Sequence, residues 1–132
     1  MVPSNAMPFE KGALYTRRQI QAAVGGSSRA ALPTRGSRVV CACLTREKNP
    51  RAPEELLVGG KERAVRLARA FAASGASVPV FVRLRRGGWE YVGARRVRSL
   101  TDDPGALQTL VAAGAPPDTS LALQLEDCPW RP

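Results

Sequence analysis

The sequence predicts an α+β fold in which a small, curved, mostly antiparallel sheet or β-barrel is flanked by about three short helices. Two observations support this prediction. An apolar stripe with helical periodicity runs through residues 61–74, and alternating strand patterns lie on both sides of a Gly-Gly pair at 87–88. With 132 residues and 44% hydrophobic content, the chain is typical of one globular domain.

The N-terminal part predicts a tail, a helix and a loop. Residues 1–8 are polar and contain proline, so we expect a disordered tail or a cloning scar, followed by a single domain over residues 9–132. Thr16 and Gln19 form a capping-box pattern that starts a short helix, and a glycine pair ends that helix. Residues 27–37 are rich in Ser, Gly and Pro, which is typical of a loop.

The middle of the chain predicts two strands and the clearest helix. Residues 38–44 are a short apolar run between turn residues, which indicates a buried strand with its two cysteines on one face. A second strand over residues 56–58 leads into a Gly-Gly-Lys sequence, where a helix N-terminus could hold one backbone phosphate. The helix over residues 61–74 has an arginine side opposite its apolar side, which fits a solvated face.

A β-hairpin is predicted around the Gly-Gly pair at 87–88. A two-residue turn there would place Arg86 opposite Trp89 and Leu84 opposite Tyr91. One face of the hairpin would then hold Val80, Val82, Leu84, Trp89 and Tyr91. A one-residue change of register would swap the two faces.

The C-terminal part predicts one more helix and one more strand. Two aspartates precede Pro104, which suits the first position of a helix running to about Ala113. Residues 120–126 alternate between apolar and polar side chains, as a half-buried strand does.

Positive charge is the strongest signal in the composition. The chain has 20 Lys+Arg against 11 Asp+Glu, a net charge of +9, and lysine only at positions 11, 48 and 61. A pI near 10.7 is typical of proteins that bind nucleic acid, and arginine suits phosphates and base edges. A GC-rich genome would also favour arginine over lysine, but it explains the excess of positive charge less well.

Residues that could support catalysis, a metal or a cofactor are missing from the sequence. The chain has no histidine, which excludes histidine-based triads. Its acidic pairs are adjacent in sequence, so on a strand their carboxylates would point to opposite faces. Three cysteines without histidine do not suggest a zinc site and fit a reduced, cytoplasmic protein. We therefore expect no enzyme activity and no cofactor.

Several short, loosely defined motifs follow one another along the chain, and their order is more informative than any one of them. The first is Phe9-x-x-Gly12-x-x-Tyr15-x-Arg17-Arg18-x-Ile20, and the later ones are Asn49-Pro50-x-Ala52-Pro53, Leu57-Val58-Gly59, Pro79-Val80-Phe81 and Trp89-x-Tyr91-Val92-Gly93. Together they resemble bacterial SRA-like domains of methylation-dependent restriction systems. The related set includes a stand-alone 5-methylcytosine-binding protein of Streptomyces and domains fused to HNH nucleases.

The resemblance implies a PUA-like β-barrel that reads modified DNA, with the base taken out of the stack as one way to read it. It covers residues 9–100 and lacks a nuclease half, which implies a stand-alone reader with a separate nuclease partner.

The resulting hypothesis is a non-enzymatic protein that binds double-stranded DNA and prefers 5-methylcytosine. The predicted phosphate or base-edge contacts are Arg17, Arg18, Arg35, Arg46, Lys48 and Arg51. The predicted wall of the base pocket is Tyr15, Trp89 and Tyr91, because bases stack on aromatic rings. Ordinary core packing remains an alternative for these aromatic residues.

Three other functions stay open at this point. An RNA-binding PUA-like domain would use the same charged and aromatic groups. A basic surface could instead dock an acidic protein. A nuclease would need acidic residues such as Glu10, Glu47 or Glu54, although the D…E-x-K arrangement is missing.

Overall fold

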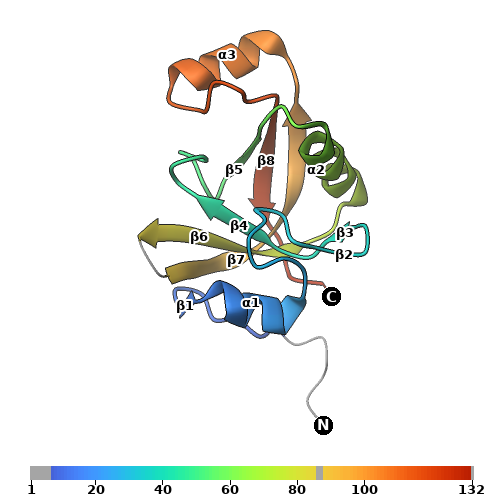
Figure 1. Cartoon of the computed structure of the whole chain (residues 1–132), viewed down its shortest axis with the longest axis vertical. Coiled ribbons are helices and arrows are strands. Elements are labelled where there is room, and N and C mark those ends of the chain that lie inside the picture. The colour runs from blue at the N-terminus through green and yellow to red at the C-terminus, as the bar shows by residue number, and fades with distance from the viewer. Residues whose placement is uncertain (1–6, 86–87, 132) are drawn as a thin grey trace.

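The computed structural model describes residues 7–85 and 88–131 (Figure 1). Its elements follow one another along the chain as β1 (Leu14–Tyr15), α1 (Arg17–Val24), β2 (Thr34–Arg35), β3 (Arg38–Val39), β4 (Ala42–Thr45), β5 (Glu55–Val58), α2 (Glu62–Ser74), β6 (Val78–Arg85), β7 (Gly88–Thr101), α3 (Pro104–Ala112) and β8 (Leu121–Asp127).

Most of the strands form one curled sheet in the order β4-β6-β7-β8-β5, and β1 pairs with β7 outside this path. The β4–β6 pair is parallel, and the other pairs of this sheet are antiparallel. The predicted α+β class, with a curved and mostly antiparallel sheet and three helices, is therefore confirmed for the described residues. Because β4 and β5 are the two edges of the sheet, the loop that joins them spans its open side.

Local signals in the sequence set the helix boundaries. The Thr16 side chain accepts a hydrogen bond from the Gln19 backbone N–H at 3.1 Å, and the Gln19 side chain accepts one from the Thr16 N–H at 2.8 Å. This confirms the predicted capping box. Helix α2 ends at Gly75 in the left-handed conformation, and Asp103 caps α3 by accepting from the Ala106 N–H at 2.9 Å.

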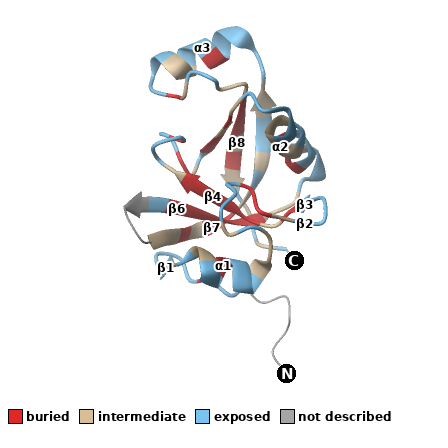
Figure 2. Ribbon diagram, viewed as in Figure 1, coloured by how far each residue is buried: buried red, intermediate tan, exposed pale blue. Residues whose placement is uncertain are grey.

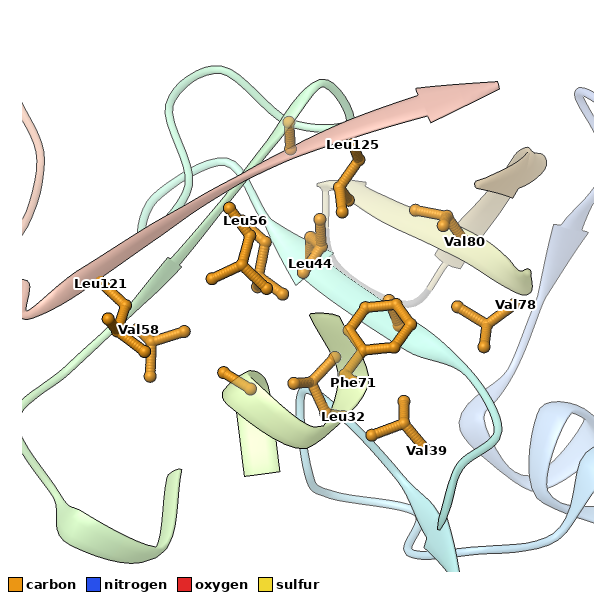
Figure 3. Packing of buried hydrophobic residues seen from close by; sticks show 14 of the residues in the cluster. Leu32, Val39, Leu44, Leu56, Val58, Phe71, Val78, Val80, Leu121 and Leu125 are labelled. Carbon is orange, nitrogen blue, oxygen red and sulfur yellow. The ribbon is translucent and has the colours of Figure 1, made fainter. Parts of the chain in front are cut away.

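Two hydrophobic clusters pack on the sheet. The larger one lies between α2 and the inner sides of β4, β5, β6 and β8 (Figures 2 and 3). The smaller one is aromatic and includes Ile20 of α1. Successive residues of β6 serve the two clusters in turn, since Val80 and Val82 belong to the larger cluster and Phe81 to the smaller. One strand thus connects both halves of the core.

The predicted strand over residues 38–44 is in fact divided. Thr34–Arg35, predicted as loop, pairs with Arg38–Val39 in a short hairpin, and β4 begins only at Ala42. Between them, the Val40 N–H donates to the Pro33 carbonyl at 2.9 Å. Within one apolar run, the backbone pairs first with β2 and then with β6. The hydrophobicity of the run gives no sign of where the pairing strand changes.

The predicted register of the hairpin was wrong. Tyr91 lies opposite Phe81 rather than Leu84, and Trp89 lies opposite Arg83. The shift of three residues is odd, so it exchanges the two faces of the strand. The register shift between Arg83 and Arg85 accounts for one of these three residues, and a second register shift lies beyond these pairs, at Val80/Phe81. The predicted turn falls partly on residues 86–87, outside the described residues.

The N-terminal prediction can be compared only in part. Residues 1–6 of the expected tail lie outside the described residues, while Met7 packs against the aromatic cluster. In the described part of the chain, no helix has both the length and the apolar character needed to cross a membrane.

Candidate nucleic-acid interface

Two cavities flank the edge strand β5 and share a wall made of Leu57, Val58, Gly59 and Ala64. The apolar cavity, of about 240 Å³, is also lined by Ala30, Ala31, Leu32, Leu56 and Leu67. The second cavity, of about 310 Å³, is completed by Lys48, Lys61, Pro116, Asp118 and Thr119. We call the two cavities together the β5 hollow. Two lysines and one aspartate lie around an apolar floor, and such a floor with a net positive rim suits a flat, uncharged ring that carries a phosphate.

The loop between β4 and β5 brings positive charge to this hollow. Its exposed cations are Arg46, Lys48 and Arg51, of which Lys48 lines the hollow, and its exposed carboxylates are those of Glu47 and Glu54. Asn49, only 4% exposed, ties the loop down: its Nδ2 donates to the Thr45 carbonyl at 3.2 Å, and its Oδ1 accepts from the Leu57 N–H at 2.8 Å. The buried amide therefore fixes a cationic loop beside the edge strand.

The opposite wall is held by close backbone contacts. A Cβ atom on Gly59 would lie 2.7 Å from Oδ2 of Asp118, so the Asp118 carboxylate packs directly on this glycine. The Ser120 hydroxyl donates to the Gly59 carbonyl at 2.8 Å, and the Ser120 N–H donates to the Val58 carbonyl at 2.8 Å. The hollow is therefore bounded by fixed backbone on this side too.

A buried carboxyl group lies on the same strand. Glu55 is 2% exposed, and its Oε2 accepts a hydrogen bond from Nε2 of Gln124 at 2.6 Å. Glu55 is therefore held inside the sheet by Gln124 and does not line the hollow.

The predicted aromatic wall lies elsewhere, in the cluster packed against α1. Tyr91 is 4% exposed, with its ring centroid 5.4 Å from that of Phe81 and 5.6 Å from that of Phe9. The Tyr15 ring is 5.0 Å from Phe9 in an edge-on arrangement, and its hydroxyl accepts from the Glu10 N–H at 2.9 Å. Burial raises the pKa of the Tyr91 hydroxyl to about 12.

The edge of this cluster carries Trp89 and two guanidinium groups. Arg17 and Arg83 lie over the indole at 5.1 and 5.9 Å from its centroid. Nη2 of Arg17 also donates to the carbonyls of Ser27 and Ala30, at 3.2 and 2.7 Å. Since Ala30 lines the β5 hollow, the hydrogen bond from Arg17 to the Ala30 carbonyl helps to position that wall of the hollow.

The structure thus separates the predicted site residues into groups. Arg46, Lys48 and Arg51 are exposed on the β4–β5 loop, and of these Lys48 lines the hollow, while Arg18 is exposed on α1. Arg35 belongs to the β2–β3 hairpin. In Figure 1 this hairpin lies on the right of the molecule and the tip of β6 on the left. Contact of any of these residues with nucleic acid stays a prediction.

Sequence reasoning missed some residues of the hollow itself. Lys61 and Asp118 line it, and so does the half-buried Leu57. The Gly-Gly-Lys junction that contains Lys61 was predicted to be able to hold one backbone phosphate, although Lys61 was not among the predicted contact residues. Asp118 carries no such signal, since its position depends on the packing of a distant loop.

The cysteines behave as predicted for a buried strand. Cys41 and Cys43 are both buried, with their Sγ atoms 3.6 Å apart, and both are free thiols. The hydrogen bond between them raises the pKa of Cys41 and lowers the pKa of Cys43. Within residues 7–85 and 88–131, no three side chains of His, Cys, Asp or Glu form a group that could hold a metal ion.

Comparison with solved structures shows that the chain has the fold of SRA domains. The structure of the SUVH5 SRA domain in complex with hemi-methylated CG DNA superposes with a TM-score of 0.63 at 11% sequence identity, covering 100% of this chain and 97% of that one. The structure of the sulfur-binding and SRA domains of ScoMcrA with phosphorothioated DNA gives a TM-score of 0.58 at 13% identity, over 96% of this chain.

The type IV phosphorothioation-dependent restriction endonuclease ScoMcrA gives a TM-score of 0.53 at 16% identity, over 93% of this chain. This chain spans 44% and 27% of the two ScoMcrA chains. The sequence matches no protein-family model and no curated protein.

Proposed function

We propose that this protein is a non-enzymatic DNA-binding module that reads modified DNA, with 5-methylcytosine as the preferred base. The main support is the fold: over nearly its full length the chain resembles an SRA domain solved with hemi-methylated DNA. The net charge of +9 supplies the attraction to phosphates that DNA binding needs. The resemblance to a restriction endonuclease extends the proposal to a role in restriction beside a separate nuclease.

The β5 hollow is the proposed reading site. Its apolar wall would take the base, while the cations of the β4–β5 loop and Lys61 would hold the flanking phosphates. Taking a base out of the stack costs a few kcal/mol. No aromatic side chain lines the hollow in the described residues, so phosphate contacts and apolar burial must offset that cost without base stacking.

Selectivity for the methyl group depends on how closely the hollow fits it. Burying one methyl group contributes about 0.8 kcal/mol, roughly a fourfold preference. A larger preference requires that the unmethylated base leave a void, because an unfilled cavity adds its own cost. The hydrogen bonds of Asn49 on one side and of Ser120 on the other support such a fit, because they restrain the backbone around the hollow.

Fluorescence anisotropy with matched duplexes tests the proposal. Unmodified, 5-methylcytosine and phosphorothioated duplexes are compared at two salt concentrations, with structured RNA as competitor. We expect the methylated duplex to bind at least about fourfold more tightly than the unmodified one. Equal affinity for both duplexes would contradict the methyl preference, and tighter binding of RNA would contradict the DNA assignment.

Paired charge variants locate the interface. R46Q/R51Q removes two exposed cations of the β4–β5 loop, and R66Q/R98Q removes two exposed cations on α2 and β7. We expect the first variant to reduce the slope of log affinity against log salt by about 2, at about 0.9 per lost contact, and the second to leave it unchanged. Equal changes in both variants would show diffuse attraction without a defined interface.

A further pair tests the hollow itself. Leu57→Trp fills it, whereas Leu14→Trp makes the same change at a side chain that is 63% exposed on β1. We expect the first to abolish the preference for methylated DNA while keeping the salt dependence, and the second to keep both. Retained preference in Leu57→Trp would place the reading site elsewhere.

A further inference from the structure

A third cavity, of about 270 Å³, lies between the end of α1, the β2–β3 hairpin, the start of β6 and the C-terminal segment. Figure 1 shows the C-terminal end of the chain beside this hairpin. Its lining includes Arg35, Arg38, Ser77, Val78, Trp130 and Arg131. We call it the hairpin pocket; it shares no lining residue with the β5 hollow.

The pocket concentrates positive charge without a counter-charge. Arg35 and Arg38 lie directly opposite each other in the hairpin, an arrangement that destabilises a strand pair when the charges are alike. Arg131 adds a third guanidinium, and the lining contains no acidic residue. The ion pairs found in the described part of the chain use other arginines. A bound anion would therefore reduce the repulsion between the Arg35 and Arg38 guanidinium groups.

The backbone fixes where these charges sit. The stem of Arg35 lies on Gly25, where an added Cβ would come within 2.6 Å of the arginine Cδ. The Arg131 N–H donates to the Ser77 hydroxyl oxygen at 2.8 Å, which holds the C-terminal segment against the start of β6. These contacts restrain the Arg35 stem and the backbone at Arg131, which lowers the conformational entropy that binding must remove.

The rest of the pocket is apolar and partly aromatic. Val24, Val39 and Val78 form its floor, and the half-buried indole of Trp130 forms one side. An indole face can stack on a nucleobase of any identity. The volume of about 270 Å³ is just below the range of small-molecule sites, so it suits one nucleotide and excludes a longer segment.

We propose that the hairpin pocket binds a nucleoside monophosphate, with the phosphate among Arg35, Arg38 and Arg131 and the base against Trp130. The ligand is either a free mononucleotide or the terminal nucleotide of a strand with a 5′-phosphate, since both present the same group. This binding does not depend on the proposed reading of modified DNA. It gives Arg35 a role outside the β5 hollow.

Calorimetric titration of the full chain with deoxycytidine monophosphate tests the proposal, with deoxycytidine and inorganic phosphate as partial ligands. We expect saturable binding of the nucleotide and at least about tenfold weaker binding of each part, because the site has both a charged and an apolar half. Inorganic phosphate binding as tightly as the nucleotide would overturn the assignment.

Variants show whether binding occurs at this place. R38Q/R131Q should weaken the nucleotide about tenfold or more, since hydrogen bonds to charged groups are lost, whereas R66Q/R98Q removes the same charge elsewhere and should change nothing. As an independent readout, the indole N–H resonance of Trp130, assigned with Trp130→Phe, should shift on titration, while that of Trp89 stays in place. A shift confined to Trp89, or none, would overturn the proposal.

Single-stranded oligonucleotides with and without a 5′-phosphate distinguish the two sources. Binding of the phosphorylated strand that exceeds the mononucleotide identifies a strand end, and the reverse identifies a free nucleotide. If an aspartate-rich peptide shifts Trp130 and no nucleotide does, the pocket docks acidic protein and the proposal fails. R38Q/R131Q should keep its preference for methylated duplex, so the two proposals can fail separately.

Discussion

The aromatic cluster under α1 and the β5 hollow lie in one sheet but differ in chemistry. The cluster contains the rings of Phe9, Tyr15, Phe81 and Tyr91 in mutual contact. Phe81 is fully buried, while Phe9 and Tyr91 also line a cavity of about 590 Å³ beside the C-terminal segment. The hollow is open and aliphatic, with lysines at its rim. The few aromatic residues of the chain, 5% of the total, are thus mostly used for packing.

This difference implies that ring stacking contributes little at the β5 hollow. In a basic protein with few aromatic residues, a ring near arginines in the sequence suggests a base-binding wall. Here the rings pack against one another and stabilise one face of the sheet. The proposed affinity at the hollow then comes from charge and from the fit of fixed walls.

The largest effect should follow from removing the ring at the centre of the cluster. Phe81 has 0% exposure, so Phe81→Ala should lower the free energy of unfolding by about 3–5 kcal/mol. Leu57→Ala at the half-buried wall of the hollow should cost about 1 kcal/mol. Urea denaturation measures both. Similar losses would show that the hollow is as much a part of the core as the cluster is.

A smaller effect should come from the arginine that connects the two regions. Arg17→Met keeps much of the stem but removes the hydrogen bonds to Ser27 and Ala30, so we expect a loss of about 1–3 kcal/mol in the free energy of unfolding. Arg18→Met, at the next and exposed position, should change it by about 0.5 kcal/mol or less. If both variants stay stable and both weaken DNA binding, Arg17 acts directly on DNA.

The smallest effect should appear as alkaline sensitivity of the cluster. Because burial raises the pKa of Tyr91 to about 12, the folded protein keeps this proton while the unfolded chain loses it near pH 10. The contribution of Tyr91 to stability is therefore fully present below about pH 10 and declines as the pH rises toward about 12. Tyr91→Phe should lose stability less steeply over this interval. Parallel pH profiles for the two proteins in chemical denaturation would contradict a buried hydroxyl.

Local signals predicted the helices well. The capping box at Thr16, the glycine at position 75 and the Asp-Pro step at 103–104 each act within a few residues, so their effect can be seen in the sequence. The apolar side of α2 was equally clear, because Ala68 and Phe71 recur at the helical period and both are buried.

The strand faces could not be predicted in the same way. The alternation of residue types in β6 and β7 shows that each strand has two faces. Which residues of the two strands share a face depends on the register, and the register shifts at two places in this hairpin. Such bulges leave no clear signal in the composition. Consequently Trp89 and Tyr91 were predicted to share a face with Val80, whereas they lie with Phe81 and Arg83 on the other face.

Net charge depends on composition, and helix capping depends on residues that are close together in the chain. The amino-acid sequence alone therefore determined the positive charge, the helices and the α+β class. The grouping of Lys48, Lys61 and Asp118 around one strand, and of Arg35, Arg38 and Arg131 around one pocket, depends on residues far apart in the chain. Such groupings arise only when the sheet curls and its loops pack, because long-range contacts set the distances between these side chains.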